Sequence, residues 1–150
     1  MREIKRNFRE RDMTAFGFLH PVLALIIWTL LIWVLMYARR IPAMQKAKIV
    51  PDTAKSPDGD WKEKLPLKTQ AAAHNYNHLL EQPTIFYALM FFIYLTERTS
   101  HSIFYLACAY VLLRIVHSVI QVSCGPVIPR FTVFTLSTLC LMGMALLAAL

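Results

Sequence analysis

The stretch from Phe16 to Tyr37, FGFLHPVLALIIWTLLIWVLMY, is long and apolar enough to cross a lipid bilayer. A hydrocarbon core about 30 Å thick requires roughly 20 predominantly apolar residues in helical form. Because backbone groups in lipid must be hydrogen-bonded within their own segment, we predict that this stretch is an α-helix. The basic residues Arg39 and Arg40 close it, as is common at the end of a membrane span.

Three further apolar stretches predict a bundle of four membrane helices. The connections near 96–102 and 123–126 are only a few residues long, and such short connections make neighbouring helices antiparallel. We therefore expect one all-α domain over residues 1–150 that runs up, down, up and down. Its predicted spans cover about residues 16–37, 71–95, 103–122 and 127–150.

The connection over residues 39–70 has a different character from the other two. It is polar and holds Pro42, Pro51, Pro57, Gly59 and Pro66, residues that interrupt regular structure. We therefore predict a long loop with at most short helical pieces.

The composition argues against a water-soluble globule. Apolar residues make up 57% and charged residues only 17% of the chain, whereas a soluble domain carries about 25% charged residues. The net charge of +7 comes almost entirely from the amino-terminal tail and the long connection. Anionic lipid headgroups account for these basic residues, so we expect a lipid bilayer and no nucleic acid as partner.

The distribution of Lys and Arg predicts the orientation in the membrane. Nine of them lie on the side of the long connection, against six on the side of the amino-terminal tail. By the positive-inside rule the 39–70 connection is expected in the cytoplasm. We therefore expect a multi-pass membrane protein.

The three cysteines do not form the pattern of a disulfide framework. Cys108 and Cys140 fall inside predicted spans and are interpreted as core residues. Cys124 lies in the short connection before the last helix, where its thiol could react.

Ionisable residues at membrane depth are the main functional candidates. Each costs about 2.5–3.5 kcal/mol on insertion scales, and such residues usually mark a site. With a rise of 1.5 Å per residue, Glu81 lies about 15 Å and Arg114 about 12 Å from the side of the long connection. His117 lies one turn from Arg114, and Arg130 opens the last helix on that side. We therefore expect all four near one membrane face.

Two interpretations of these charges are open. Glu81 and Arg114 could form a structural ion pair that lets two helices bury their charges. However, polar residues follow helical spacing on both helices, which favours a polar cavity open to one side. On the second helix these are His74, Asn77, His78 and Gln82, and on the third His117, Ser118 and Gln121.

The charge of the predicted cavity indicates the kind of ligand. Arg114 and Arg130, together with Arg39 or Arg40, outnumber the single carboxylate of Glu81. This balance suits a small anion that carries carboxylates and an amine. A metal or haem held by His74, His78 and His117 is an alternative, but His on polar helix faces more often forms hydrogen bonds, and we expect no metal.

Two motifs resemble the MAPEG superfamily, the membrane-associated proteins in eicosanoid and glutathione metabolism. The stretch NHLLEQPTIFYAL at 77–89 is similar to the signature of the family's second helix. YVLLRIVHS at 110–118 is similar to that of its third helix. Arg130 lies where the family places a functional arginine, at the start of the fourth helix. The chain resembles a bacterial-type member over most of its length, which implies a multi-pass protein of a bacterial inner membrane.

This resemblance implies a homotrimer that binds glutathione between neighbouring subunits near the cytoplasmic face. Glu81 would receive the glutathione amine and Asn77 or His78 would bind its backbone, while Arg114 and His117 would line the peptide site. Arg130 would be the catalytic residue that stabilises the thiolate, the nucleophile of the reaction. The predicted glutathione-binding set is Asn77, His78, Glu81, Arg114, His117, Gln121, Arg39, Arg40 and His74.

The chain departs from the family pattern at three positions. His74 stands where glutathione-using members carry an arginine, Gln121 where a tyrosine is common, and Phe134 where an aromatic hydroxyl is expected. The expected function is a membrane glutathione transferase or peroxidase acting on lipophilic electrophiles. The alternatives are a non-catalytic subunit or scaffold that keeps the fold, and a channel or small-molecule carrier.

Overall fold

The computed structural model describes residues 15–50, 52 and 59–150, and this part of the chain is built from four long α-helices. It contains no β-strand within those residues, so the predicted all-α fold is confirmed. A short 3-10 helix, η2, covers Asp60–Lys62 in the long connection. The helices are α2 (Ala15–Lys46), α3 (Leu67–Leu95), α4 (His101–Val122) and α5 (Val127–Ala149).

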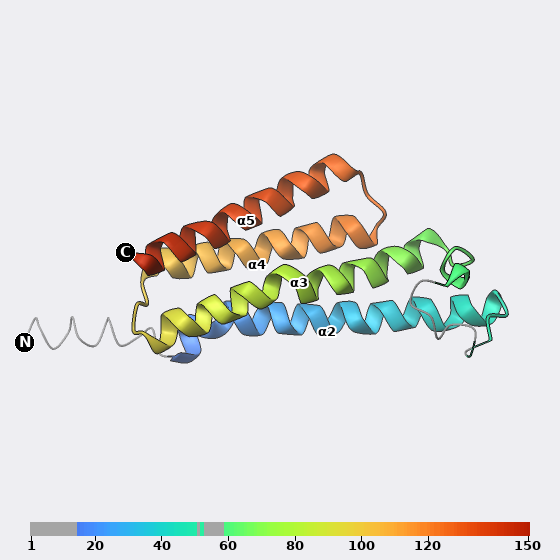
Figure 1. Cartoon of the computed structure of the whole chain (residues 1–150), viewed down its shortest axis with the longest axis horizontal. Coiled ribbons are helices and arrows are strands. Elements are labelled where there is room, and N and C mark those ends of the chain that lie inside the picture. Colours follow the sequence, from blue (N-terminus) through green and yellow to red (C-terminus); the bar gives the residue numbers. More distant parts are fainter. Residues whose placement is uncertain (1–14, 51, 53–58) are drawn as a thin grey trace, which may run out of the picture.

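The four helices lie alongside one another and alternate in direction (Figure 1). α2 packs along α3, and α4 packs along α5, while α4 also contacts α2 and α3 and so joins the two hairpins. The described parts of the long connection and the α4–α5 turn lie at one end of the bundle, which we call the loop end. The start of α2, the α3–α4 connection and the carboxyl terminus lie at the other end (Figure 1). This is the predicted up-down-up-down order.

Local sequence signals account for the helix ends. Ser100 has extended backbone angles and its side-chain oxygen accepts a hydrogen bond from the Ile103 backbone N–H at 3.3 Å, which is an N-cap of α4. Pro66 and Pro126 precede α3 and α5, where a missing N–H costs nothing because the first turn has no acceptor for it. These signals account for the starts of α3, α4 and α5, although α3 begins at Leu67 rather than near residue 71 as predicted.

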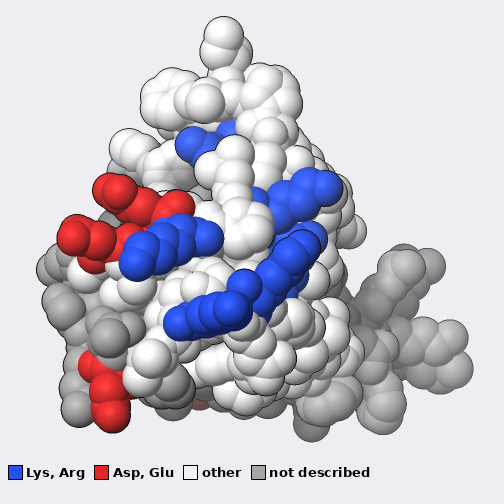
Figure 2. All heavy atoms as spheres, turned by 90° about the vertical axis from the view of Figure 1, so that its right-hand side faces the viewer, with Lys and Arg blue, Asp and Glu red and all other residues white. Residues whose placement is uncertain are grey.

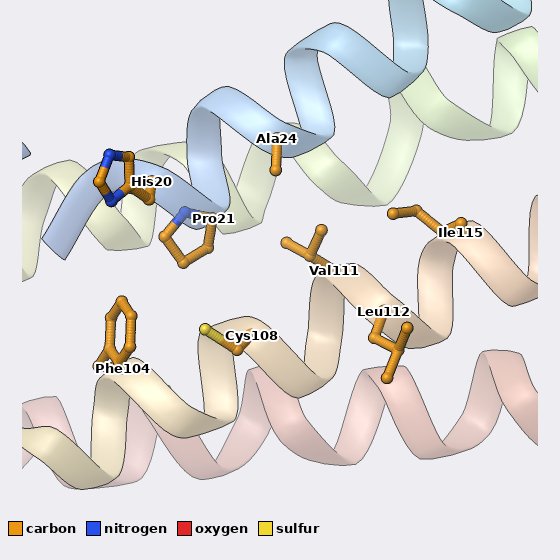
Figure 3. Close-up of a pocket in the computed structure, with 8 residues that line it drawn as sticks. All are labelled: His20, Pro21, Ala24, Phe104, Cys108, Val111, Leu112 and Ile115. Carbon is orange, nitrogen blue, oxygen red and sulfur yellow. The ribbon is translucent and has the colours of Figure 1, made fainter. Parts of the chain in front are cut away.

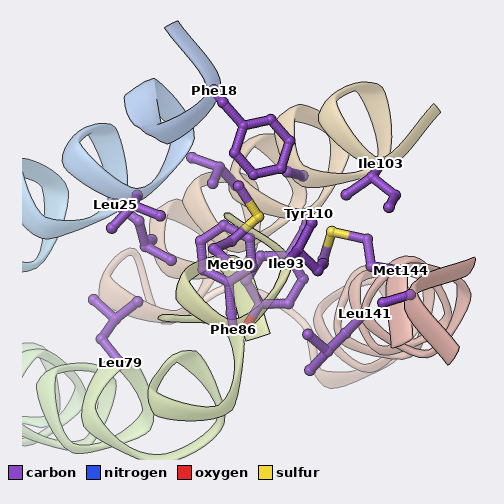
Figure 4. Close-up of a cluster of buried hydrophobic side chains, with 14 of the residues drawn as sticks. Phe18, Leu25, Leu79, Phe86, Met90, Ile93, Ile103, Tyr110, Leu141 and Met144 are labelled. Carbon is purple, nitrogen blue, oxygen red and sulfur yellow. The ribbon is translucent and has the colours of Figure 1, made fainter. Parts of the chain in front are cut away.

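A buried apolar cluster fills the centre of the bundle towards the end away from the loops (Figure 4). The rings of Phe86 and Tyr110 stack across α3 and α4 with centroids 4.5 Å apart. The residues labelled in Figure 4 come from all four helices and are all buried: Phe18, Leu25, Leu79, Phe86, Met90, Ile93, Ile103, Tyr110, Leu141 and Met144.

Helix α2 is longer than the span predicted from hydropathy. It continues through Arg39, Arg40 and Pro42 to Lys46, so the long connection does not begin at residue 39 as predicted. A proline inside a helix removes one backbone hydrogen bond, but contacts from Arg39 and Arg40 to other parts of the chain hold this extension in place. Tertiary contacts thus override the local signal.

Three helices in the described part of the chain are long and apolar enough to cross a membrane. They are the segments Gly17–Lys46, His101–Val122 and Val127–Ala149. The sequence predicts four spans, and α3 is the one that does not reach the same apolar character. The physical reason is the polar half of α3, where His74, Asn77, His78 and Glu81 lower the mean hydropathy of a helix of 29 residues.

Lys and Arg side chains gather at the loop end of the bundle, with acidic side chains to one side of them (Figure 2). The amino-terminal tail that enters the predicted orientation lies outside the described residues, as does Lys55. The described basic residues of the loop end are Arg39, Arg40, Lys46, Lys48, Lys62, Lys64, Lys68 and Arg130.

A polar cavity at the loop end of the helix bundle

A cavity of about 190 Å³ opens at the loop end, where α3 begins, α4 ends and α5 begins. It brings together His74, Gln121 and Arg130, three of the residues predicted from the sequence. We call this the polar cavity. Its lining residues are Leu67, Ala71, His74, Gln121, Cys124, Gly125 and Arg130.

Gln121 is the most deeply buried polar residue of this cavity, with 5% of its surface exposed. Its side-chain oxygen accepts a hydrogen bond of 3.0 Å from the side-chain amide of Asn75 on α3. Within the described residues, the buried side-chain atom of this pair that lacks a hydrogen-bond partner is Oδ1 of Asn75. A buried acceptor without a partner is costly, so this pair of side chains has capacity for one more hydrogen bond.

Arg114 lies on α4 about two helical turns further from the loop end than Gln121. It is fully buried between α3, α4 and α5. Its guanidinium donates a hydrogen bond of 2.9 Å to the backbone carbonyl of His78 and one of 3.5 Å to the side-chain oxygen of Gln82. The ring centroid of Phe134 lies 5.5 Å from the guanidinium carbon. All three partners are neutral, so the positive charge is solvated by dipoles and a ring face.

Two histidines surround Phe134 beside this arginine. The ring of His117 lies 5.8 Å and that of His78 lies 6.4 Å from the Phe134 ring, centroid to centroid. His117 is buried, and its Nδ1 has no hydrogen-bond partner among the described residues. Other buried polar atoms of α4 without a partner are Nε of Arg114, the hydroxyl oxygen of Ser118 and that of Tyr110. In the described chain, this interior therefore contains polar atoms that form no hydrogen bond.

Glu81 does not form the ion pair with Arg114 that one interpretation of the sequence required. The two residues lie at the same level, because Arg114 contacts His78 and Gln82 on either side of Glu81. However, the Glu81 side chain is 67% exposed, and its carboxylate lies 3.5 Å from Nδ1 of His78. The physical reason is helical phase: residues 78 and 82 face α4, whereas Glu81 points out of the bundle with the exposed Asn77.

Arg39 and Arg40 contact protein groups rather than the polar cavity. Arg39 donates to the backbone carbonyl of Val122 at 2.9 Å and to that of Lys68 at 3.1 Å. The first of these bonds satisfies a carbonyl in the last turn of α4, where positive charge is favourable. The guanidinium of Arg40 lies over the buried ring of Trp61 in η2, 4.8 Å from its centroid. In the described chain, both arginines connect the end of α2 to neighbouring segments at the loop end.

The sequence interpretation missed Asn75, which is fully buried and whose side-chain amide donates the hydrogen bond to Gln121. A signal was present, because Asn75 lies at the helical spacing of the buried positions Ala72, Leu79 and Phe86. Gln82 likewise does more than was inferred, since its nitrogen also donates to the Thr138 hydroxyl on α5 at 2.8 Å.

A second cavity, of about 320 Å³, lies between α2 and α4 (Figure 3). Its walls are almost entirely apolar, with Phe104, Val111 and Ile115 on α4 facing Pro21 and Ala24 on α2. It begins near the start of both helices, at the end of the bundle away from the polar cavity. The two cavities are therefore separate.

The fold and the cavity together define an α-helical membrane protein whose polar, positively charged site opens at one end of the bundle. A comparison with known families assigns the chain to one of them. The family model of the MAPEG family matches residues 18–150, and the chain belongs to this family. Comparisons with curated proteins and with solved structures gave no match.

Proposed function

We propose that this protein is a membrane enzyme that binds glutathione and uses its thiolate against lipophilic electrophiles or hydroperoxides. The observation that carries the proposal is the meeting of Arg130, His74 and the buried side-chain amide of Gln121 in one cavity at the loop end. A guanidinium beside neutral donors suits the carboxylates and thiolate of an acidic peptide. Membership of the MAPEG family supports glutathione as that peptide.

The donor set fits this ligand on its anionic side. Arg130 lies at the cavity surface, and Arg114 supplies a second positive charge at greater depth. Buried polar atoms without a partner, among them Nδ1 of His117 and the Ser118 hydroxyl, leave capacity for more hydrogen bonds. Removing such groups from water has a cost that a polar ligand offsets.

The carboxylate proposed to receive the glutathione amine supports an assembly of several copies. Glu81 and Asn77 point out of the bundle at the depth of Arg114, although α3 packs within a membrane protein. A polar face turned towards lipid is unfavourable, so a neighbouring copy that covers it would remove that cost. We propose that α3 faces a neighbour in a homotrimer and that the glutathione site is completed there.

Glutathione supplies the nucleophilic sulfur of the proposed reaction. The fixed guanidinium of Arg130 stabilises negative charge on that sulfur, because a charge held in a site of low dielectric interacts strongly with its partner. His74 and Gln121 position the peptide by hydrogen bonds from either side of the cavity. The lipophilic substrate reaches the sulfur from the surrounding bilayer.

Replacing Arg130 tests this role. We expect Arg130→Ala to lower glutathione conjugation and hydroperoxide reduction by roughly 100-fold, about the loss seen when a donor to developing charge is removed. Arg130→Lys keeps the charge without the planar donor geometry and should retain an intermediate rate. The matched control is Arg98→Ala at the opposite end of the bundle, where the side chain binds the Ala148 carbonyl. Unchanged turnover in Arg130→Ala contradicts the proposal.

A non-catalytic membrane subunit is the second candidate function. The arrangement of Arg114 favours it, since neutral groups of the chain already bind this guanidinium. Isothermal titration with glutathione separates the two candidates. Binding together with turnover supports the enzyme, whereas no binding at millimolar concentration, with a co-purifying protein partner, supports the subunit.

A further inference from the structure

Asn75 on α3 lies beside the polar cavity without forming part of its wall. Ala71, one helical turn before it, and His74, the preceding residue, both line the cavity, whereas Asn75 does not. The Asn75 side chain is fully buried, on the face of α3 that also buries Ala72 and Leu79. Any effect of Asn75 on a molecule held in the cavity must therefore pass through a neighbouring side chain.

That neighbour is Gln121, in the last turn of α4. The side-chain amide nitrogen of Asn75 donates a hydrogen bond of 3.0 Å to the side-chain oxygen of Gln121. Both side chains are buried, Asn75 completely and Gln121 with 5% of its surface exposed, and Gln121 lines the polar cavity. The bond therefore links a residue outside the cavity to one in its wall.

A buried asparagine at this position has a cost in stability. Its Oδ1 has no hydrogen-bond partner among the described residues, so one end of its amide is unsatisfied there. An apolar side chain of similar volume would pack between α3 and α4 without that cost. What an apolar residue could not supply is the hydrogen bond to Gln121.

This bond decides which end of the Gln121 amide is turned towards Asn75. A side-chain amide carries an acceptor oxygen at one end and a donor NH₂ at the other, and rotation about its last bond exchanges the two. Because the oxygen of Gln121 is turned towards Asn75, the NH₂ is the end left to face the cavity. Gln121 and Arg130 then both offer N–H donors to a ligand held between them.

We propose that Asn75 is a positioning residue of the polar cavity, which holds the NH₂ of Gln121 towards the ligand. The proposal rests on the proposed function, because it assigns the specificity of the same glutathione site. At this position the site selects a hydrogen-bond acceptor, namely a carboxylate or peptide carbonyl oxygen of glutathione. A ligand that presents a donor there leaves two donors facing each other and is rejected.

Isothermal titration of the full-length protein in detergent with glutathione tests the positioning role. Asn75→Leu removes the bond and keeps most of the volume, and we expect roughly fivefold weaker binding because the freed amide turns either end to the ligand. Gln121→Met removes the donor itself and should weaken binding roughly tenfold. Adding Asn75→Leu to Gln121→Met should cause no further loss, because Asn75 acts through Gln121.

This cycle separates positioning from packing. An equal loss from Asn75→Leu in both backgrounds shows a general effect on packing and overturns the proposal, as does unchanged affinity in the Asn75→Leu single variant. Thr29→Val is the control, since it removes another buried hydrogen bond, from the Thr29 hydroxyl to the Leu25 carbonyl within α2, away from this cavity. It should leave glutathione affinity unchanged, and a loss as large as that of Asn75→Leu also overturns the proposal.

Nuclear magnetic resonance of the unmodified protein gives a measurement that does not depend on the folding of Asn75→Leu. With isotope-labelled glutamine, the NH₂ signals of Gln121 are assigned by their absence from Gln121→Met. We expect these proton signals to shift when glutathione is added, because the NH₂ then donates to the ligand. Signals that stay in place while glutathione binds overturn the proposal.

The proposed function and the role of Asn75 fail in different ways. If the unmodified protein does not bind glutathione, the proposed function is wrong and the selection by Asn75 is wrong with it. If the protein binds glutathione and turns over, but Asn75→Leu binds it equally well, the enzyme stands and only the positioning role is overturned.

Discussion

Arg114 shows how a single side chain connects the interior of the bundle to the site. Its charge is fully buried, and among the described residues its partners are a carbonyl, an amide oxygen and a ring. Burying a charge without a carboxylate is expensive, so structure alone does not require an arginine at this position. The anionic ligand of the proposed function would account for a positive charge here.

Two substitutions of Arg114 separate these roles. Arg114→Ala leaves a cavity, and we expect it to lower the free energy of unfolding by about 2–5 kcal/mol. Arg114→Met keeps most of the volume and removes the buried charge, so stability should change by less than about 1.5 kcal/mol. Glutathione affinity should fall in both variants. Thermal unfolding in detergent and isothermal titration measure the two effects, and equal losses of stability in both variants would contradict this account.

At the scale of elements, the α4–α5 turn determines the shape of the polar cavity. The turn places Cys124 and Gly125 on the cavity wall and sets the direction in which α5 leaves α4 (Figure 1). A side chain at Gly125 would bring its Cβ to 2.9 Å from Ile120 Cγ2 and to 3.0 Å from the Ile120 carbonyl oxygen. The carbonyl is backbone and cannot move aside, so glycine is required here by space.

Alanine substitutions at two glycines test this turn. Gly125→Ala must displace the end of α4, and we expect it to cost about 1–3 kcal/mol of stability. Gly143→Ala lies inside α5, where the new Cβ meets only a side-chain carbon of Leu106 at 3.4 Å. Removing a mid-helix glycine there should be neutral or stabilise by up to about 1 kcal/mol. Unfolding midpoints of both variants in the same detergent check the contrast, which equal midpoints would refute.

At the scale of the whole molecule, the bundle leaves one polar helix face uncovered. Glu81 and Asn77 are exposed on α3, beside the half-buried His78. The proposed homotrimer covers this face and brings a carboxylate towards the positive charge of a neighbouring copy.

Substitution of Glu81 tests the assembly. We expect Glu81→Gln to lower the temperature at which the detergent-solubilised oligomer dissociates, because the amide carries no charge for the neighbour. Glu97→Gln is the control, since Glu97 is also exposed but lies after α3 at the opposite end. Native mass spectrometry follows the oligomer. Identical dissociation of both variants would show that Glu81 does not contribute to the contact.

The distribution of charge leads to a prediction about orientation. The loop end carries the basic side chains seen in Figure 2, and the α4–α5 turn, which contains Cys124, lies at the same end. If this end faces the cytoplasm, a membrane-impermeant maleimide should label Cys124 in inverted membrane vesicles and not in intact spheroplasts. Cys124→Ser gives the background from Cys108 and Cys140. Labelling from the outside would reverse the assigned orientation.

Helix order and number were predictable because hydropathy is local. Each apolar run had to satisfy its backbone within itself, and the short connections required antiparallel neighbours. The end of α2 was not predictable, since Arg39 and Arg40 stabilise it by contacts with Val122 and Trp61, which are distant in sequence. The predicted ion pair between Glu81 and Arg114 was wrong for a similar reason. Counting residues gives the depth of each side chain in the membrane, but packing between helices decides which way Glu81 points.

The sequence by itself therefore determined the class of protein, the four helices and the level at which polar residues cluster. The reason is that a bilayer requires long helical apolar spans and disfavours polar residues at depth. Only the tertiary structure decided which polar residues share a cavity. His74, Gln121, Cys124 and Arg130 come from two helices, the α4–α5 turn and the start of α5. Their meeting depends on helix phase and on the direction of one turn, and both are set by side-chain packing between elements.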